Sequence, residues 1–199
     1  MGALHKGHSE LIKAAKNFEV SKPLAVLTSI FINPLQFGPS EDFNRYPRNL
    51  KADSEIANKA GSSALWAPSI KDIFPDRDSK KSKNHAPKSL VSNLCGAKRP
   101  GHFDGVVNVV QRLLTLVQPD VLVLGEKDWQ QLVVIQHLIQ EMDIPVQLRS
   151  IATVRNQEGL AYSSRNAYLT DNEKKKIVAL PKLLNQSAKK FTSSNKINI

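Results

Sequence analysis

Two histidines three residues apart, His5 and His8, lie in the opening stretch Met1–His8. Side chains at positions i and i+3 share a face in a helical turn, so the two imidazoles could converge on one ligand. A helix is predicted from Ser9 onward, and its N-terminus would offer unpaired N–H groups and the positive end of the helix dipole to a phosphate. Taken alone, the pair fits equally well two solvated histidines at a frayed chain end.

A second candidate site is the turn Gly125-Glu126-Lys127-Asp128, which follows a predicted buried strand at 120–124 and opens a predicted helix. Backbone N–H groups in such a strand–turn–helix junction can meet phosphate, and Lys127 would add a mobile positive charge. The alternative is an ordinary turn, in which Lys127 is a surface residue and Asp128 is a helix cap.

The stretch Gly159–Asn166 combines hydroxyl side chains with Arg165 in a loop that begins with glycine. Such a loop can clamp a triphosphate during transfer, because arginine offers a fork of N–H donors. On pattern alone, an ordinary serine-rich turn is the better interpretation. The stretch Arg99–Phe103 has two interpretations as well: another anion site, or a turn before a helix.

Several other chemistries are disfavoured. The chain contains neither G-x-x-x-x-G-K-[ST] nor G-x-G-x-x-G, so it has neither the P-loop nor the dinucleotide-binding signature. Cys95 has no clear base nearby, and the cysteine and histidines are not clustered at zinc-ligand spacing. Phosphate-suited loops and two histidines therefore indicate a nucleotidyl-transfer site, with the acceptor left open.

The formal charge of +10 invites a nucleic-acid interpretation, but its distribution argues against one. The excess positive charge is confined to 71–99 and 171–199, which lack the interleaved aromatic residues of a base-stacking surface. We interpret these segments as a mobile loop and a solvated terminal helix. A single cysteine indicates a reducing compartment, and no signal peptide or bilayer-length apolar run is visible. We therefore expect a cytoplasmic protein with no nucleic-acid or membrane partner.

The order of predicted elements is that of an α/β fold. Apolar, β-branched runs predict buried strands, and segments with helical spacing lie between them. The strands are predicted at 24–32, 63–67, 120–124 and 145–151, and the helices at 9–15, 49–60, 105–117, 128–142 and from 170 onward. Because ligands bind beyond the carboxyl ends of parallel strands, the loops that start at Asn33 and Gly125 are expected on one rim.

With these elements in place, the motifs resemble in type and order those of the pantoate–β-alanine ligases (pantothenate synthetases), within the nucleotidyltransferase superfamily. The matching segments span roughly residues 1–185, and they are 1–8, 29–37, 46–48, 99–103, 125–132 and 163–166. The resemblance implies a Rossmann-like parallel sheet with helices on both faces. It also implies condensation of pantoate with β-alanine through a pantoyl adenylate, in which ATP, accompanied by Mg²⁺, is converted to AMP and pyrophosphate. A homodimer is implied as well.

The resemblance also implies roles for individual residues. His8, His5, Lys127 and Arg165 correspond to catalytic positions. The ATP-binding positions are Met1, Gly2, Ala3, Leu4, His5, Lys6, Gly7, His8, Gly125, Glu126, Lys127, Asp128, Val154, Tyr162, Ser163, Ser164 and Arg165. The substrate positions are Gln36, Gln131, Asn33 and Arg99. Asp53 matches a position near the metal, although a solvated helix acid is the alternative.

In two respects the chain departs from the family pattern. The central strand that precedes the first motif is expected to be missing, and the C-terminal domain is expected to be truncated. We therefore expect a nucleotide-binding domain at 1–151, followed at 152–199 by the signature loop and the start of the shortened domain. The alternatives are an inactive nucleotide-binding remnant, an adenylyltransferase for another acceptor and, last, a nucleic-acid-binding protein.

Overall fold

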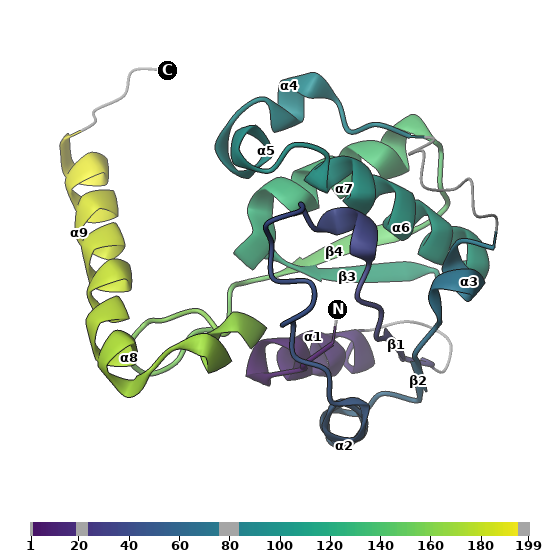
Figure 1. Ribbon diagram of the computed structural model, residues 1–199, viewed down its shortest axis with the longest axis horizontal. Coiled ribbons are helices and arrows are strands. Elements are labelled where there is room, and N and C mark those ends of the chain that lie inside the picture. The colour runs from purple at the N-terminus through teal and green to yellow at the C-terminus, as the bar shows by residue number, and fades with distance from the viewer. Residues whose placement is uncertain (1, 19–23, 76–83, 195–199) are drawn as a thin grey trace.

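The computed structural model describes residues 2–18, 24–75 and 84–194 (Figure 1). The middle of the predicted mobile loop at 71–99, residues 76–83, therefore lies outside the described residues. The helices are α1 (Lys6–Lys16), α2 (Leu50–Ala60), α3 (Ile70–Ile73), α4 (Lys88–Val91), α5 (Leu94–Lys98), α6 (His102–Val117), α7 (Trp129–Glu141), α8 (Asp171–Ile177) and α9 (Ala179–Ser194). The strands are β1 (Leu27–Ser29), β2 (Ala64–Trp66), β3 (Val121–Gly125) and β4 (Gln147–Ile151), and the 3₁₀ turns are η1 (Pro34–Gln36), η3 (Glu126–Asp128) and η4 (Ser164–Tyr168).

The strands pair in parallel, as predicted. β1 pairs with β2 in the register Leu27 to Ala64, and β3 pairs with β4 in the register Val121 to Gln147. Within the described ranges these form two separate two-stranded sheets, with no ladder joining β1 to β3. The fold is thus α/β with parallel pairing, but the pairing is divided between two short sheets.

The prediction of long, buried strands is wrong for the first of them. Only three residues of the apolar run 24–32 form β1, and Leu27 is 42% exposed. β3 has the predicted length, but every residue in it is only half-buried. A strand is buried on both faces only when it has paired neighbours and covering helices. β1 pairs on one side alone, which explains its exposure.

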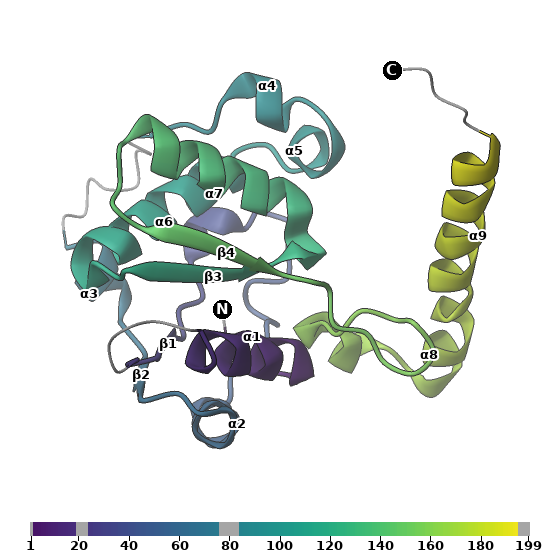
Figure 2. The same ribbon diagram turned by 180° about the vertical axis from the view of Figure 1, so that it is seen from behind.

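Helices lie on both faces of the β3–β4 sheet, which confirms that part of the predicted fold class. α6 and α7 cover one face and α1 lies against the other (Figures 1 and 2). Leu122 and Leu124 of β3 pack into the α6–α7 core, where Val134 and Ile135 are fully buried. A second core around Ile12 joins α1 and α2 with Val26, just before β1, and Leu65 of β2. Apolar burial of this kind is the main stabilising contribution to the fold.

The basic segment 71–99 is largely folded where it is described, so its prediction as a mobile loop is wrong for that part. α4 and α5 lie there and are held by Gln130 of α7. The amide of Gln130 donates to the carbonyls of Leu90 and Asn93, both at 2.9 Å, and accepts the backbone N–H of Cys95 at 3.0 Å. The side chain of Gln130, together with the packing of Leu90 and Val91 against the core, thus holds a segment whose own composition is typical of a loop.

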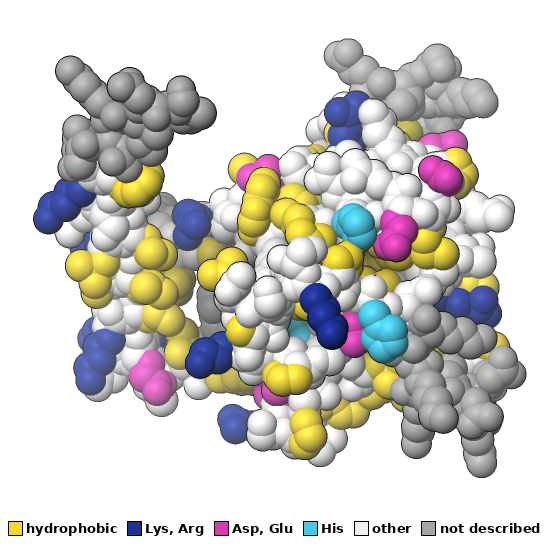
Figure 3. All heavy atoms as spheres, turned by 90° about the horizontal axis from the view of Figure 1, so that it is seen from above, with side chains coloured by type: hydrophobic (Ala, Val, Ile, Leu, Met, Phe, Trp, Pro, Cys, Tyr) yellow, Lys and Arg dark blue, Asp and Glu magenta, His cyan; other side chains and the backbone are white. Residues whose placement is uncertain are grey.

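The prediction of a solvated terminal helix is confirmed. α8 begins after Thr170, as predicted, with Thr170 and Glu173 forming a capping box. α9 lies apart from the main body (Figure 1). Hydrophobic side chains gather along α9 (Figure 3), among them Phe191, which is 65% exposed. A break at Val178 separates α8 from α9. Pro181 lies in the first turn of α9, where proline is tolerated. Among the described helices, none is both long and apolar enough for a membrane crossing.

Candidate functional site

A cavity of about 350 Å³ lies where the loops after β3 and β4 meet the start of α1 and the turn η1. Gln36 and Gly125 both line it, which confirms that the loops starting at Asn33 and Gly125 share one rim. The predicted site residues that line this cavity are His5, Gly7, His8, Gln36, Arg99, Gly125, Lys127, Asp128, Gln131, Val154, Tyr162, Ser163, Ser164 and Arg165. The structure therefore brings together residues from all of the candidate stretches.

The loop before α1 is fixed by a buried acid. Asp53, only 2% exposed, accepts the backbone N–H of Ala3 at 3.0 Å and that of Leu4 at 2.6 Å. From the other side, the hydroxyl of Ser164 donates to the carbonyl of Ala3 at 2.9 Å. A Cβ added at Gly2 would lie 3.1 Å from a carboxylate oxygen of Asp53, so glycine suits this close approach. The loop before α1 is thus hydrogen-bonded both to Asp53 of α2 and to Ser164 of η4.

His5 and His8 lie against each other at the start of α1, which begins at Lys6 and not at the predicted Ser9. The two ring centroids are 4.0 Å apart. Nδ1 of His5 accepts the backbone N–H of Gly7 at 3.1 Å, and Nδ1 of His8 accepts the backbone N–H of His5 at 3.2 Å. Both rings therefore cap the helix and are held in one orientation by the backbone that they cap.

These contacts also determine which ring nitrogen of each histidine carries the proton. Burial, followed by the neighbouring His5, lowers the pKa of His8 to about 3. Burial and the charge of Lys127 lower the pKa of His5 as well. A neutral ring whose Nδ1 accepts a hydrogen bond carries its proton on Nε2. At neutral pH each histidine thus presents an Nε2–H donor to a ligand in the cavity that both rings line.

Two cations face the same cavity from different loops. Lys127 lies in η3 directly after β3, and its ammonium is 3.3 Å from Asp128. Arg165 lies in η4, where its Nε and one Nη donate to Asp42 at 2.9 and 2.7 Å. This hydrogen-bonded pairing lowers the pKa of Asp42 and raises the pKa of Arg165, so both groups are charged at neutral pH. The cavity can therefore offer an anion the cationic groups of Lys127 and Arg165, each of which lies beside a carboxylate.

Gln36 is placed by a close junction between η1 and α6. A Cβ added at Gly105 of α6 would lie 2.3 Å from the carbonyl oxygen of Leu35, so only glycine permits this approach. Asn33, fully buried, accepts the backbone N–H of Leu35 at 3.2 Å and donates to the carbonyl of Gly105 at 3.0 Å. These contacts bring Gln36 to the cavity wall.

Arg99 and His102 also contact the backbone of Gln36, at its carbonyl oxygen. Nδ1 of His102 is 2.7 Å from the Gln36 carbonyl and Nη2 of Arg99 is 3.3 Å from it. Arg99 also binds both carboxylate oxygens of Glu41, at 2.6 and 2.8 Å. Burial lowers the pKa of His102, so a neutral ring can donate from Nδ1 and accept from Arg99 at Nε2, 2.9 Å away.

A family model described as pantoate-beta-alanine ligase matches residues 1–198 of the chain. The chain belongs to this family. The expectation drawn from the motifs is therefore confirmed at the level of the family.

Curated relatives support the assignment and show its extent. A bifunctional pantoate ligase/cytidylate kinase of Prochlorococcus marinus strain MIT 9313 is 53% identical over the whole chain, which covers 39% of that protein. A protein of the same description from Synechococcus sp. strain CC9605 is 52% identical over 92% of the chain and 37% of its own length. The chain thus spans about two fifths of the length of these relatives.

Solved structures of pantoate–β-alanine ligases share the fold. The pantothenate synthetase of Thermus thermophilus has a TM-score of 0.85 at 41% identity, over 92% of this chain and 64% of the other. The ligase of Francisella tularensis, described as complexed with beta-gamma ATP and β-alanine, has a TM-score of 0.85 at 38% identity, over 93% and 69%.

Some residues expected at the ligase site do not line the cavity, and Met1 lies outside the described residues. Gly2, Ala3, Leu4, Lys6, Glu126, Asn33 and Asp53 are absent from the cavity lining. Asn33 and Asp53 are buried, and their polar side-chain atoms bind backbone groups. Glu126 points toward β4, where it accepts the hydroxyl of Ser150 at 2.8 Å. The side chains of Asn33 and Asp53 thus hold the backbone around the cavity.

A metal site built from protein side chains is not found in the part of the chain that the structure describes. No group of three or more histidine, cysteine, aspartate or glutamate residues is placed to hold an ion there. Asp53 in particular uses both carboxylate oxygens on backbone amides. A magnesium ion that accompanies a nucleotide commonly takes most of its ligands from phosphate oxygens and water.

The sequence reasoning missed the acids Glu41 and Asp42 and gave no role to His102 or Tyr168. Tyr168 donates its hydroxyl to Asp42 at 2.9 Å, across 126 residues of sequence. The available signal was the acidic pair itself, which stands between two recognised motifs on a rim rich in positive charge. Its partners are distant in the sequence, so only the fold reveals the pairing.

Proposed function

We propose that this chain forms the adenylating site of a pantoate–β-alanine ligase and condenses pantoate with β-alanine at the cost of ATP. The observation that carries the proposal is the convergence of His5, His8, Lys127 and Arg165 on the cavity that Gln36 and Gln131 also line. Four phosphate-suited groups thus surround one volume, with two amide side chains beside them.

In the first step, a carboxylate oxygen of pantoate attacks the α-phosphorus of ATP. The bond from that phosphorus to the bridging oxygen of the β-phosphate breaks, and pyrophosphate leaves. Negative charge develops on the phosphate oxygens, so fixed donors and cations stabilise the transition state. We assign this role to the Nε2–H groups of His5 and His8 and to the charges of Lys127 and Arg165.

In the second step, the neutral amine of β-alanine attacks the acyl carbon of pantoyl adenylate. The C–O bond to AMP breaks, an amide forms and the amine gives up a proton. Water must be kept from the adenylate, because hydrolysis would waste it. We assign pantoate binding to Gln36 and Gln131, with Gln36 also bordering β-alanine. The apolar cavity wall of α6, including Val106 and Val109, limits solvent there.

ATP arrives in this scheme as its Mg²⁺ complex, with the phosphates as the main ligands of the ion. The residues Gly125–Asp128, Val154 and Tyr162–Arg165 complete the ATP site. We further propose two functional segments, 1–151 for nucleotide binding and 152–199 for the signature loop and the helices after it. By likeness to the family we also propose a homodimer in the cytoplasm.

The deciding experiment measures AMP release by the purified chain, given ATP, Mg²⁺ and pantoate, with and without β-alanine. Release that depends on β-alanine is the expected result. A folded chain that binds ATP but releases no AMP would support an inactive nucleotide-binding relative. AMP release with a different acceptor, unaffected by Gln36→Ala, would support another adenylyltransferase.

A further inference from the structure

Two adjacent acids tie the loop at 37–48 to two arginines that line the cavity. Glu41 forms a two-point ion pair with Arg99, which precedes α6. Asp42 forms a two-point ion pair with Arg165, which lies in η4. The loop therefore connects Arg99, which contacts the backbone of Gln36, to Arg165, one of the proposed phosphate-binding groups.

The pairing between Asp42 and Arg165 uses only one edge of the guanidinium. Nε donates to Oδ2 at 2.9 Å, and Nη2 donates to Oδ1 at 2.7 Å. The remaining nitrogen, Nη1, has no hydrogen-bond partner among the described residues. A guanidinium has five N–H donors in a planar fork, so the edge that contains Nη1 can still bind an anion in a bidentate manner.

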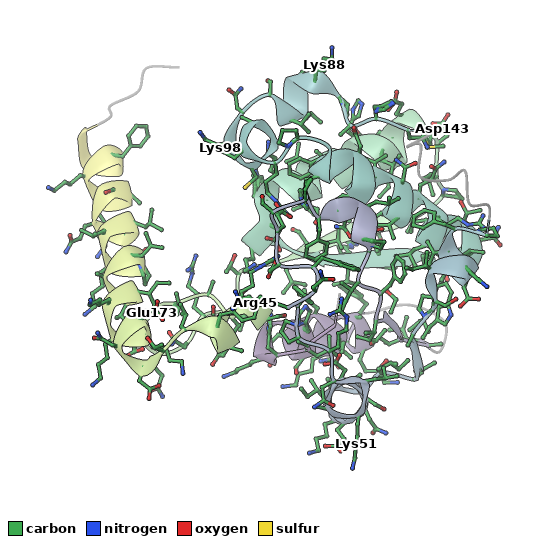
Figure 4. The ribbon with its side chains drawn as sticks, in the orientation of Figure 1. Arg45, Lys51, Lys88, Lys98, Asp143 and Glu173 are labelled. Carbon is green, nitrogen blue, oxygen red and sulfur yellow. The ribbon has the colours of Figure 1, made fainter. Side chains whose placement is uncertain are left out.

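Asp42 is itself held in place. The hydroxyl of Tyr168 donates to Oδ2 of Asp42 at 2.9 Å, and the guanidinium of Arg165 stacks over the Tyr46 ring at 5.4 Å. The guanidinium carbon of Arg45 lies 5.5 Å from the centroid of the Tyr168 ring. Arg45 is labelled in Figure 4 and shows where this cluster lies. Acid, guanidinium and rings form one packed unit, which fixes the plane of the guanidinium.

We propose that Asp42 is a positioning residue for the triphosphate, because it holds the Nε edge of Arg165 and leaves the Nη1 edge for phosphate oxygens. The inference rests on the proposed ATP site. A flexible arginine would lose side-chain entropy on binding, and an arginine already fixed by Asp42 has lost it beforehand. An acid in a phosphate site thus contributes through orientation, although its own charge repels the ligand.

The test measures dissociation constants by calorimetry for an ATP analogue with a non-hydrolysable β–γ bridge and for adenosine. The variants are Asp42→Asn, Asp42→Ala, Tyr168→Phe and Arg165→Ala, with Asp42→Asn also made in the Arg165→Ala background. Asp171→Asn is the matched control, since that acid is exposed and, among the described residues, its ion pair is with Lys174. AMP release is measured in parallel.

We expect Asp42→Ala to weaken analogue binding by about 3- to 10-fold, with a smaller loss for Asp42→Asn, which keeps one accepting oxygen. Adenosine binding should not change, and Asp42→Asn should add nothing in the Arg165→Ala background. Tyr168→Phe should give a partial loss, and Asp171→Asn none.

Unchanged or tighter analogue binding in both Asp42 variants would overturn the inference, because Asp42 would then be neutral or would compete with phosphate for Arg165. Equal losses for adenosine and for the analogue would also overturn it, since they indicate a merely structural role. If the expected binding pattern appears without AMP release, the proposed ligase activity is overturned and the inference about Asp42 stands. If the unaltered chain does not bind the analogue, both proposals fall.

Discussion

The carboxylate of Asp53 accepts the backbone N–H of Leu4 at 2.6 Å, across 49 residues of sequence. Its other oxygen accepts the neighbouring N–H of Ala3, and the side chain is almost completely buried. Buried polar groups need such partners, because an unsatisfied one costs about 1–3 kcal/mol. Asp53 thus sets the path of the loop that leads to both histidines.

Replacement of Asp53 by asparagine should destabilise the fold, because an amide NH₂ would face a backbone N–H. We expect the free energy of unfolding to fall by about 2 kcal/mol. Urea denaturation measures the change, and Glu55→Gln, an exposed acid on the same helix, is the control. Unchanged stability together with a raised Mg²⁺ requirement would instead make Asp53 a metal ligand.

Replacement of Gly105 by alanine should separate α6 from η1. The new Cβ would lie 2.3 Å from the carbonyl oxygen of Leu35, and backbone must move to relieve the clash. Overpacking of this kind costs about 1–3 kcal/mol, and KM for pantoate should rise because Gln36 moves with η1. At Gly38, the added Cβ would make only an ordinary contact 3.7 Å from Glu41, so Gly38→Ala should leave stability unchanged. Equal effects at both positions would contradict this account.

Much of the fold follows from local signals in the sequence. Asn49 and Gly61 bound α2 as their residue types predict, and the capping box at Thr170 opens α8. The strand at 24–32 was predicted too long, because apolar character indicates burial but does not reveal which neighbouring strand pairs with it. Strand pairing is a long-range property, and local patterns report it poorly.

The residues of the candidate site also fall into those that local patterns predict and those that only the fold reveals. His5, Lys127 and Arg165 belong to motifs whose residue types and local context indicate phosphate chemistry. Asn33 was expected among the substrate positions through the resemblance, but its packing against Gly105 makes its side chain a buried support. Asp42 carries no local sign of its role, because its partner Arg165 lies 123 residues away.

Removal of the charge at Lys127 should slow the reaction without destabilising the protein, because this side chain is partly exposed. We expect Lys127→Met to lower kcat for AMP release by about 100-fold, the usual effect of removing one transition-state donor. Lys88→Met is the control, since Figure 4 shows Lys88 on α4 at the periphery. A raised KM for ATP with unchanged kcat would mean that Lys127 binds the ground state and the transition state equally.

Acidification should destabilise the protein through His8. Burial lowers the pKa of His8 from 6.5 to about 3, so between these values the unfolded chain binds a proton that the folded chain does not. Stability therefore falls as the pH drops below 6.5 and no longer changes through this group below pH 3. From pH 7 to 5, the free energy of unfolding should fall about 2 kcal/mol further in the unaltered chain than in His8→Gln.

This pH range lies above the ordinary pKa values of aspartate and glutamate, so ion pairs such as Asp42 with Arg165 stay charged throughout. Guanidinium unfolding at pH 7 and pH 5 measures the difference, and His85→Gln, at an exposed histidine, serves as control. Parallel pH dependence in the unaltered chain and in His8→Gln would show that His8 titrates normally in the folded state. An imidazolium would then face the phosphates in mildly acidic solution, and AMP release would depend on pH near 6.5.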